Sequence, residues 1–380
     1  MKLRLFRLVT SASSLGLVKG QLQYITEGEY DCFAVSGGPE ESAREFTERE
    51  GIPTILISHL VRPISIGNDI RALSELIRLF RREKPDIVHA NTPKASLLGM
   101  VAAWICRVPH RIYTVTGLRF ETSTGFMRWL LKTMERITCA CATKVIPEGE
   151  GVKKTLYREH ITRKPMQVLH HGNINGINLD HYDRTEEVMA EASKIREKVG
   201  GDFTFLFVGR IVRDKGIAEL VAAFTRLHRD HPETRLVLVG NQELELDPLP
   251  DETQQQIRDC DGIIEAGWQS DVRPWFVASD VFTFPSYREG FPNVVMQAGA
   301  LGIPSIVTDI NGSNEIILEG QNGTIIPKQD TEALYRKMLW ALGNRDALTE
   351  MSANCRPQIA SRYRQEDVWR ATLDMYNELL

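Results

Sequence analysis

Long apolar runs are missing from this chain of 380 residues. No stretch of about 18 consecutive apolar residues occurs, so we expect no membrane-spanning segment. The basic and then apolar N-terminus superficially resembles a signal peptide, but Arg7 interrupts its apolar run. We therefore expect Leu3–Val9 to be a first β-strand. Repeats and low-complexity tracts are also absent, and the composition, 42% hydrophobic and 25% charged, is that of an ordinary globular protein.

Cysteines are few and scattered, with six in the whole chain. Their spacing favours free thiols in a reducing compartment over disulfides, which predicts a cytoplasmic protein. Cys139 and Cys141 look like half of a zinc site, but no second Cys or His pair follows at ligand spacing. No Asp-x-Asp cluster falls at the end of an expected strand either. The sequence therefore predicts no metal site and no bound cofactor.

Negative charge is unevenly divided along the chain, whose formal net charge is −4. Residues 1–172 hold 25 Lys and Arg against 17 Asp and Glu, whereas the remainder holds 21 against 33. A basic half on an acidic protein suggests that one domain meets something anionic, such as a membrane surface or a phosphorylated lipid. The alternative is that these charges form a solvated helix face. No nucleic-acid partner is expected.

Short apolar runs alternate with helical patterns along the whole chain, which is typical of βα units and parallel sheets. The first series of expected strands is Leu3–Val9, Cys32–Val35, Thr54–Ser58, Asp86–Ala90, Arg111–Thr116, Lys144–Pro147 and Gln167–His170. The second is Phe203–Val208, Arg235–Val239, Ile263–Ala266, Val281–Pro285, Ser305–Thr308 and Gly323–Ile326. Between them, 173–200 has a Gly/Asn-rich loop and no strand, which marks a domain boundary. We expect an α/β protein with two doubly wound domains, 1–172 and 173–365, and an amphipathic last helix at 366–380.

The loop after the expected strand Phe203–Val208 carries two cations at the start of a helix. Gly209 lets a ligand approach the backbone, and Arg210 and Lys215 add positive charge where the helix dipole already favours anions. A diphosphate suits this arrangement. The alternative is an ordinary positively charged turn.

The loop after Val281–Pro285 places a carboxylate before a helix. Glu289 falls in this loop, and Gln297 lies eight residues later on the inward face of the helix. The carboxylate can accept hydrogen bonds from sugar hydroxyls. The helix begins within Gly290-Phe291-Pro292-Asn293-Val294, where exposed N–H groups can receive phosphate oxygens.

These segments together resemble the retaining glycosyltransferases of the GT-B fold, specifically family 4. The signature of that family is Glu-x7-Glu after a strand, and this chain has Glu289-x7-Gln297 in that context. The resemblance covers nearly the whole chain and includes Gly209-Arg210 with Lys215, Val239-Gly240, Gly267-Trp268 before Asp271-Val272-Arg273, and Thr308-Asp309-Ile310-Asn311-Gly312 with Glu315. The segments His89-Ala90-Asn91-Thr92-Pro93-Lys94 and Pro109-His110-Arg111-Ile112-Tyr113 resemble the subgroup that builds capsule, O-antigen and lipid-linked glycans in bacteria.

The resemblance implies an acceptor-binding N-terminal domain and a nucleotide-sugar-binding C-terminal domain that face a central cleft, with the last helix crossing back to the first domain. It implies that Arg210 and Lys215 bind the donor diphosphate, Glu289 the sugar hydroxyls and position 297 the ribose hydroxyls. Gly240 and Trp268 are expected to complete the donor site.

The chain departs from the family pattern at three positions. Gln297 replaces a carboxylate by an amide, which keeps an acceptor but loses charge assistance. Thr116 and Asn91 stand where relatives often have His, so no role of those histidines can be carried over.

Candidate acceptor-side residues are Gly16, Asn91, Lys94, Thr116, Arg119 and Glu121. His89 is expected at a strand end facing the cleft, where it would take part in catalysis; a satisfied structural histidine is the alternative. Trp104 and Trp129 fall on helical apolar stripes and are expected to pack in the interior, and Trp369 to dock the last helix.

The expected function is transfer of a sugar, with retention, from a nucleotide-diphosphate donor such as a UDP-hexose or UDP-N-acetylhexosamine. The expected acceptor is a polyprenyl-diphosphate-linked glycan at the inner membrane surface, to which the protein would attach peripherally. The alternatives are a non-catalytic protein that binds nucleotide sugars and a sugar-nucleotide 2-epimerase of similar architecture.

Overall fold

The computed structural model describes residues 2–243 and 247–379, and the chain divides into two compact units. Unit 1 comprises Met1–Gly176 and Gln365–Leu380, and unit 2 comprises Ile177–Arg364. Met1 and Leu380, at the ends of the expected first domain and last helix, lie outside the described residues. Unit 1 extends past residue 172 because the Gly/Asn-rich loop packs on it, with Asn175 Nδ2 donating to the Lys19 carbonyl at 3.0 Å.

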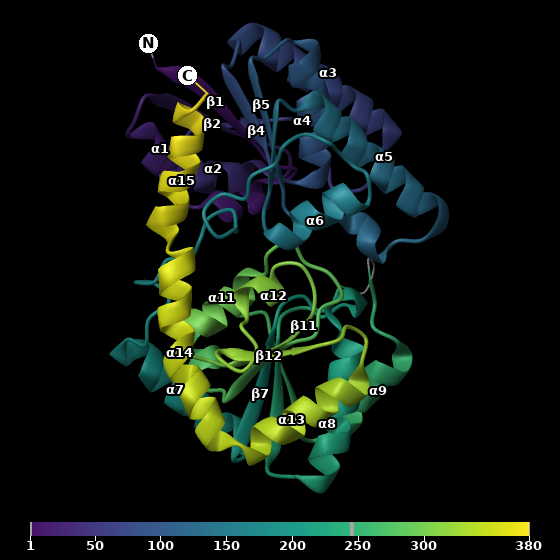
Figure 1. Cartoon of the computed structure of the whole chain (residues 1–380), viewed down its shortest axis with the longest axis vertical. Coiled ribbons are helices and arrows are strands. Elements are labelled where there is room, and N and C mark those ends of the chain that lie inside the picture. The colour runs from purple at the N-terminus through teal and green to yellow at the C-terminus, as the bar shows by residue number, and fades with distance from the viewer. Residues whose placement is uncertain (1, 244–246, 380) are drawn as a thin grey trace. The chain divides into compact units, whose positions relative to one another are not determined.

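Unit 1 is built around a parallel sheet of order β3-β2-β1-β4-β5-β6. The strands are β1 (Leu3–Leu8), β2 (Tyr30–Ser36), β3 (Thr54–Leu56), β4 (Ile87–Ala90), β5 (His110–Val115) and β6 (Lys144–Pro147). The helices are η1 (Ala12–Val18), α1 (Gln21–Thr26), α2 (Glu40–Glu50), α3 (Ile66–Glu83), α4 (Pro93–Ile105), η2 (Arg119–Thr122), α5 (Gly125–Cys141), α6 (Glu150–Arg158) and α15 (Gln365–Asn377). Figure 1 shows α1, α2 and α15 on one side of this sheet and α3, α4 and α5 on the other.

Unit 2 repeats the architecture with sheet order β12-β11-β10-β7-β8-β9. Its strands are β7 (Phe203–Val208), β8 (Thr234–Val239), β9 (Ile263–Gly267), β10 (Val281–Phe284), β11 (Ser305–Thr308) and β12 (Gly323–Ile326). Its helices are α7 (Glu186–Val199), η3 (Arg213–Lys215), α8 (Ile217–Asp230), α9 (Asp251–Asp259), α10 (Arg273–Val277), α11 (Asn293–Ala300), α12 (Ser313–Ile316), α13 (Thr331–Gly343) and α14 (Arg345–Tyr363). Every residue of β7 is buried, as a strand covered on both faces requires.

The predicted pair of doubly wound parallel-sheet domains is confirmed. Of the expected strands, only Gln167–His170 is wrong among the described residues. His170 has a φ of 51°, so the chain turns there, and Leu169 packs on the core from a loop. None of the helices in the described part of the chain is long and apolar enough to cross a bilayer.

The tryptophans follow the sequence-based expectation only in part. Trp369 on α15 is packed in unit 1: its Nε1 donates to Asn175 Oδ1 at 2.7 Å, and a Cβ added at Gly20 would lie 2.6 Å from its ring. Trp104 and Trp129 were expected in the interior, and that is wrong, since they are 58% and 57% exposed. A helical stripe of apolar residues predicts that these side chains share one face of the helix, but it does not predict whether that face points to the core or to solvent.

Candidate active site in unit 2

Three strands of unit 2 end in a closely packed set of glycines. Gly209 follows β7 with a φ of 151°, and Gly240 follows β8 with a φ of 141°. A Cβ added at Gly240 would lie 1.8 Å from the Gly209 carbonyl oxygen, so only glycine fits there. The Gly240 N–H in turn donates to the Gly267 carbonyl at 2.9 Å. These glycines let the ends of β7, β8 and β9 pack closely against one another at the carboxyl edge of the sheet.

The loops that follow β7 and β10 are held together at this edge of the sheet. Gly216, which ends η3 with a φ of 70°, lies so near Pro285 that an added Cβ would be 2.1 Å from the Pro285 oxygen. The Tyr287 N–H donates to the Asp214 carbonyl at 2.8 Å. This contact brings the cationic loop and the Glu289 loop into one site.

Lys215 and Glu289, predicted separately from their loops, are ion-paired through Lys215 Nζ and Glu289 Oε1. Ser286 Oγ donates to the same carboxylate oxygen at 3.0 Å. Lys215 Nζ also lies 5.0 Å from the centroid of the Phe284 ring. Both charged side chains are mostly shielded, at 16% and 18% exposure, so their interaction is weakly screened.

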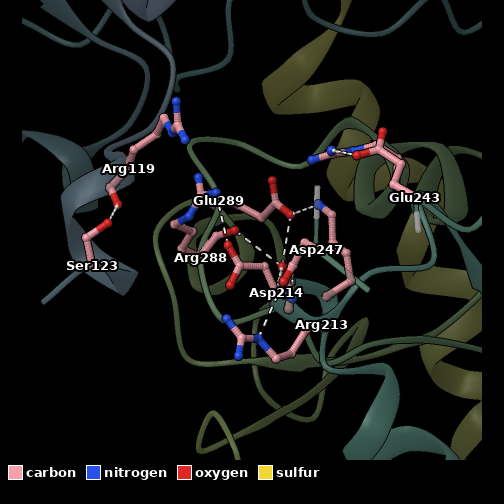
Figure 2. Close-up of polar contacts among 11 residues, drawn as sticks. Arg119, Ser123, Arg213, Asp214, Glu243, Asp247, Arg288 and Glu289 are labelled. Atoms are coloured by element: carbon pink, nitrogen blue, oxygen red, sulfur yellow. Dashed lines mark hydrogen bonds and ion pairs between the residues drawn. The ribbon is translucent and has the colours of Figure 1, made fainter. Parts of the chain in front are cut away.

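Two further ion pairs involve residues close in sequence to Lys215 and Glu289, and Figure 2 draws them. Arg288 Nη2 lies 3.1 Å from Asp214 Oδ2, and Arg213 Nε lies 3.4 Å from Asp247 Oδ1. Asp247 also accepts the Asp214 N–H at 2.9 Å. Sequence reasoning missed Asp214, Asp247 and Ser286. Asp214 stands directly before Lys215 in the sequence, but nothing in the sequence links Asp247 to it.

Arg210 contacts a different carboxylate from Lys215. Its Nη1 lies 2.8 Å from Glu243 Oε2, and its side chain is 57% exposed. Because the Arg210 side chain is exposed, it can exchange its contact with Glu243 for a contact with a ligand phosphate at little cost in free energy.

Helix α11 begins next to Glu289, with Pro292 as its first flanking residue and no side chain capping its N-terminus. The early N–H groups of a helix have no intrahelical acceptor, so the start of α11, which includes Val294, offers donors toward an anion. Gly290 and Phe291 are buried instead, and the Phe291 ring packs against Tyr363 with centroids 5.4 Å apart.

Gln297 lies on α11 and is half-buried. Burial raises the pKa of Tyr182 to about 12, and a hydrogen bond with Gln297 opposes that rise. Tyr182 comes from the stretch before α7, and no sequence signal pointed to it. Trp268 follows β9 and is 68% exposed.

His89 in unit 1 does not face a ligand-binding edge, and that prediction is wrong. It is 1% exposed, its Nδ1 lies 2.5 Å from Arg7 Nη1 and 2.6 Å from the Tyr376 hydroxyl, and its Nε2 lies 2.6 Å from Thr114 Oγ1. Burial first, and the Arg7 charge second, hold the pKa of His89 well below its usual value. The ring is a neutral structural group that ties β1, β4, β5 and α15 together.

The acceptor-side candidates are divided between surface and interior. Gly16 and Arg119 are exposed, and the Arg119 carbonyl accepts from Ser123 Oγ at 3.0 Å (Figure 2). Lys94 is ion-paired with Asp69 at 2.7 Å. Glu121 is half-buried and has a partner.

Asn91 and Thr116 meet at the ends of β4 and β5, where Thr116 Oγ1 donates to the Asn91 carbonyl at 2.8 Å. Asn91 is 1% exposed, and both polar atoms of its side chain lack a hydrogen-bond partner among the described residues. Buried amides without partners are rare, so this one marks a place where a further polar group would fit.

Comparison with known proteins adds an independent line of support. The profile of the glycosyl transferases group 1 matches residues 202–344, and that of the glycosyl transferase 4-like domain matches residues 23–172. The chain is 31% identical to the capsular polysaccharide biosynthesis glycosyltransferase CapM of Staphylococcus aureus, over 99% of this chain and 97% of that protein. It is 27% identical to an Escherichia coli UDP-Gal:alpha-D-GlcNAc-diphosphoundecaprenol alpha-1,3-galactosyltransferase, over 83% and 81% of the two chains.

Solved structures share the fold. HepE of Anabaena, in complex with UDP-glucose, superposes with a TM-score of 0.80 at 18% identity over 99% of this chain and 100% of that one. Sucrose-phosphate synthase from Thermosynechococcus elongatus gives a TM-score of 0.80 at 17% identity over 100% and 99%.

Proposed function

The chain belongs to the group 1 glycosyl transferases, and we propose that it transfers a sugar from a UDP-sugar to a lipid-linked glycan with retention of anomeric configuration. The observation that carries the proposal is the Lys215–Glu289 pair at the strand ends of unit 2, beside the N-terminus of α11. It joins a cation suited to a diphosphate with a carboxylate suited to sugar hydroxyls.

Each donor group has a partner in the proposed complex. Lys215 keeps spare donors after its contact with Glu289, because an ammonium group has three. Together with Arg210 it stabilises the charge that develops on the departing diphosphate. Glu289 accepts hydrogen bonds from the sugar, while Gln297 accepts one from the ribose. Gly209, Gly240 and Trp268 border the nucleotide.

The reaction follows from that placement. The bond between the anomeric carbon and the diphosphate oxygen breaks through an oxocarbenium-like state. The acceptor hydroxyl attacks from the same face, and its proton passes to the leaving diphosphate. No protein nucleophile is required, and the half-buried pair supplies electrostatic stabilisation in a shielded site.

The acceptor and the location are inferred from the relatives and from charge. The Staphylococcus aureus relative is a capsular polysaccharide enzyme, and the Escherichia coli relative acts on a diphosphoundecaprenol-linked sugar. We therefore place the reaction on a polyprenyl-diphosphate-linked glycan in capsule or related surface-glycan synthesis. The protein would work in the cytoplasm, peripherally attached to the inner membrane face, with no metal and no nucleic acid involved.

A donor screen tests the proposal directly. Melting temperatures are measured with UDP-, GDP- and dTDP-sugars, and a selective UDP-sugar raises the apparent stability by mass action. UDP release is then followed with and without a lipid-linked acceptor, and the anomeric configuration of the product is read by NMR. UDP release that needs no acceptor would favour the epimerase, and donor binding without any transfer would favour a non-catalytic protein.

A further inference from the structure

Helix α5 of unit 1 turns its apolar face outward. Phe126, Trp129 and Ile137 are 72%, 57% and 44% exposed, and Met127 is 47% exposed. At 3.6 residues per turn these side chains, with Leu130 between them, share one side of the helix. An amphipathic helix on a sheet normally presents that side to the core.

The opposite, polar side of α5 is the one that packs on unit 1. Arg128 Nη2 and Lys132 Nζ lie 2.8 Å and 2.9 Å from Glu159 Oε2 at the end of α6. Glu135 is buried and accepts the Tyr113 hydroxyl at 2.7 Å. These contacts fix the rotation of α5 about its own axis. The apolar face therefore points outward because the polar face is held by Glu159 and Tyr113.

Two of the outward side chains of α5 contact each other, and the neighbouring helix α4 also exposes apolar side chains. The rings of Phe126 and Trp129 stack with centroids 5.7 Å apart. Helix α4, which packs against α5, ends in Trp104 and Ile105, 58% and 38% exposed. In Figure 1, α5 lies next to α4 on the side of the sheet that also carries α3.

Positive charge is concentrated in the segment of the chain that carries this apolar face. Residues 93–165, from α4 through the segment after α6, hold 13 Lys and Arg against 5 Asp and Glu. Residues 1–92 hold 12 of each, so the positive excess of the first half lies in this segment. Arg107, Arg158 and Arg163 are exposed on the elements that flank α5, whereas Glu159 is paired with Arg128 and Lys132.

We infer that the outer face of α5 docks the protein on the surface of an anionic lipid bilayer. Aromatic and aliphatic side chains enter the headgroup boundary while the flanking arginines meet lipid phosphates. A second copy of the chain fits poorly, because a two-fold interface would set these cations against themselves. The role of this docking rests on the proposed function, since docking on the bilayer would bring unit 1 to a lipid-linked acceptor.

Vesicle cosedimentation of the full chain tests the inference. We compare phosphatidylglycerol-containing vesicles with pure phosphatidylcholine vesicles for the wild type and for the Phe126→Ser/Trp129→Ser variant. The control Met189→Ser/Leu339→Ser removes two exposed apolar side chains from unit 2, which are 42% and 37% exposed. We expect binding to anionic vesicles that weakens with salt, a loss of about 10-fold or more in the double variant and no change in the control.

Three outcomes would overturn the docking surface. In the first, the wild-type protein stays in the supernatant with anionic vesicles at low salt. In the second, the Phe126→Ser/Trp129→Ser variant binds these vesicles as well as the wild type does. In the third, the wild type is a dimer in solution and the double variant is a monomer. Donor binding and transfer to a water-soluble acceptor are measured on the same samples. Failure of those assays with vesicle binding intact would instead refute the proposed function.

Discussion

The two units of this chain use their ionisable side chains in opposite ways. Unit 1 buries Arg7, His89 and Tyr376 within hydrogen-bonding distance of one another between its sheet and α15. Unit 2 sets Lys215 and Glu289 at the ends of its strands, where each keeps part of its surface. Groups buried in the interior can act only on folding, whereas groups at a strand end can exchange a protein partner for a ligand.

This difference predicts that the two sets of residues affect different properties, catalytic activity in unit 2 and folding stability in unit 1. Changes in the unit 2 pair should lower the rate and leave folding almost unaltered. Changes in the buried groups of unit 1 should alter unfolding and leave the rate per folded molecule unaltered. The following variants test that separation.

Lys215→Ala should have the largest effect. Loss of a preorganised cation at the departing diphosphate is expected to lower kcat by about 100- to 1000-fold. The pair is mostly shielded, but Glu289 keeps its hydrogen bond from Ser286 in the variant, so the free energy of unfolding should fall by only about 1–2 kcal/mol. Initial rates and urea unfolding measure the two quantities, and Lys337→Ala, which removes an exposed ion pair with Glu319, is the control. A large loss of stability with an unchanged kcat would contradict the comparison.

Glu135→Gln should stabilise unit 1 in a pH-dependent way. Burial raises the pKa of Glu135 from 4.5 to about 7. Between those values the unfolded chain loses its proton first, so the contribution of Glu135 to stability falls as pH rises from about 4.5 to 7. The amide cannot ionise and still accepts the Tyr113 hydroxyl. We expect unfolding at pH 8 to cost about 2–3 kcal/mol more than in the wild type.

Urea unfolding at pH 4.5 and pH 8 checks the sign, because the gain should nearly vanish at the lower pH. Glu150→Gln on the exposed start of α6 is the matched control. An equal gain at both pH values would mean that the burial of a charge is not the cause.

The sequence predicts the sheets of this fold much better than the directions of its side chains. Continuous apolar runs such as Phe203–Val208 have few ways to be satisfied except as buried parallel strands. Lys215 and Glu289 could each be predicted as site residues because both follow strands and parallel strands end at one edge of the sheet, where the structure pairs them. His89 could not be placed, since its partner Tyr376 comes from the far end of the chain. The rotation of α5 likewise depends on Glu159, which no periodicity reveals.

Tyr376→Phe tests the buried network of unit 1. The variant keeps the ring but removes the hydroxyl that contacts Arg7 and His89 at 3.0 Å and 2.6 Å. A buried group that loses a hydrogen-bond partner costs about 1–2 kcal/mol, so the melting temperature should fall while kcat stays constant. Tyr157→Phe, which removes an exposed hydroxyl bonded to the Lys164 carbonyl, serves as the control. If kcat of the folded Tyr376→Phe protein fell as steeply as in Lys215→Ala, the network would have to reach the reacting atoms.

Gln297→Glu should have the smallest effect, and it asks how far the site of unit 2 depends on charge. A carboxylate at this position cannot donate to Tyr182 as the Gln297 amide does, so the Tyr182 hydroxyl would have to turn and donate to it. The carboxylate would bind ribose hydroxyls through charge-assisted hydrogen bonds, which are roughly twice as strong as neutral ones. We expect the donor KM to fall about 2- to 5-fold with kcat nearly constant, because a ribose contact is equal in the ground and transition states. Gln255→Glu on α9 adds the same charge at an exposed position. A KM that rises in Gln297→Glu but not in Gln255→Glu would show that position 297 faces the negative diphosphate rather than the ribose, and Gln297 would then belong with the cations of the site.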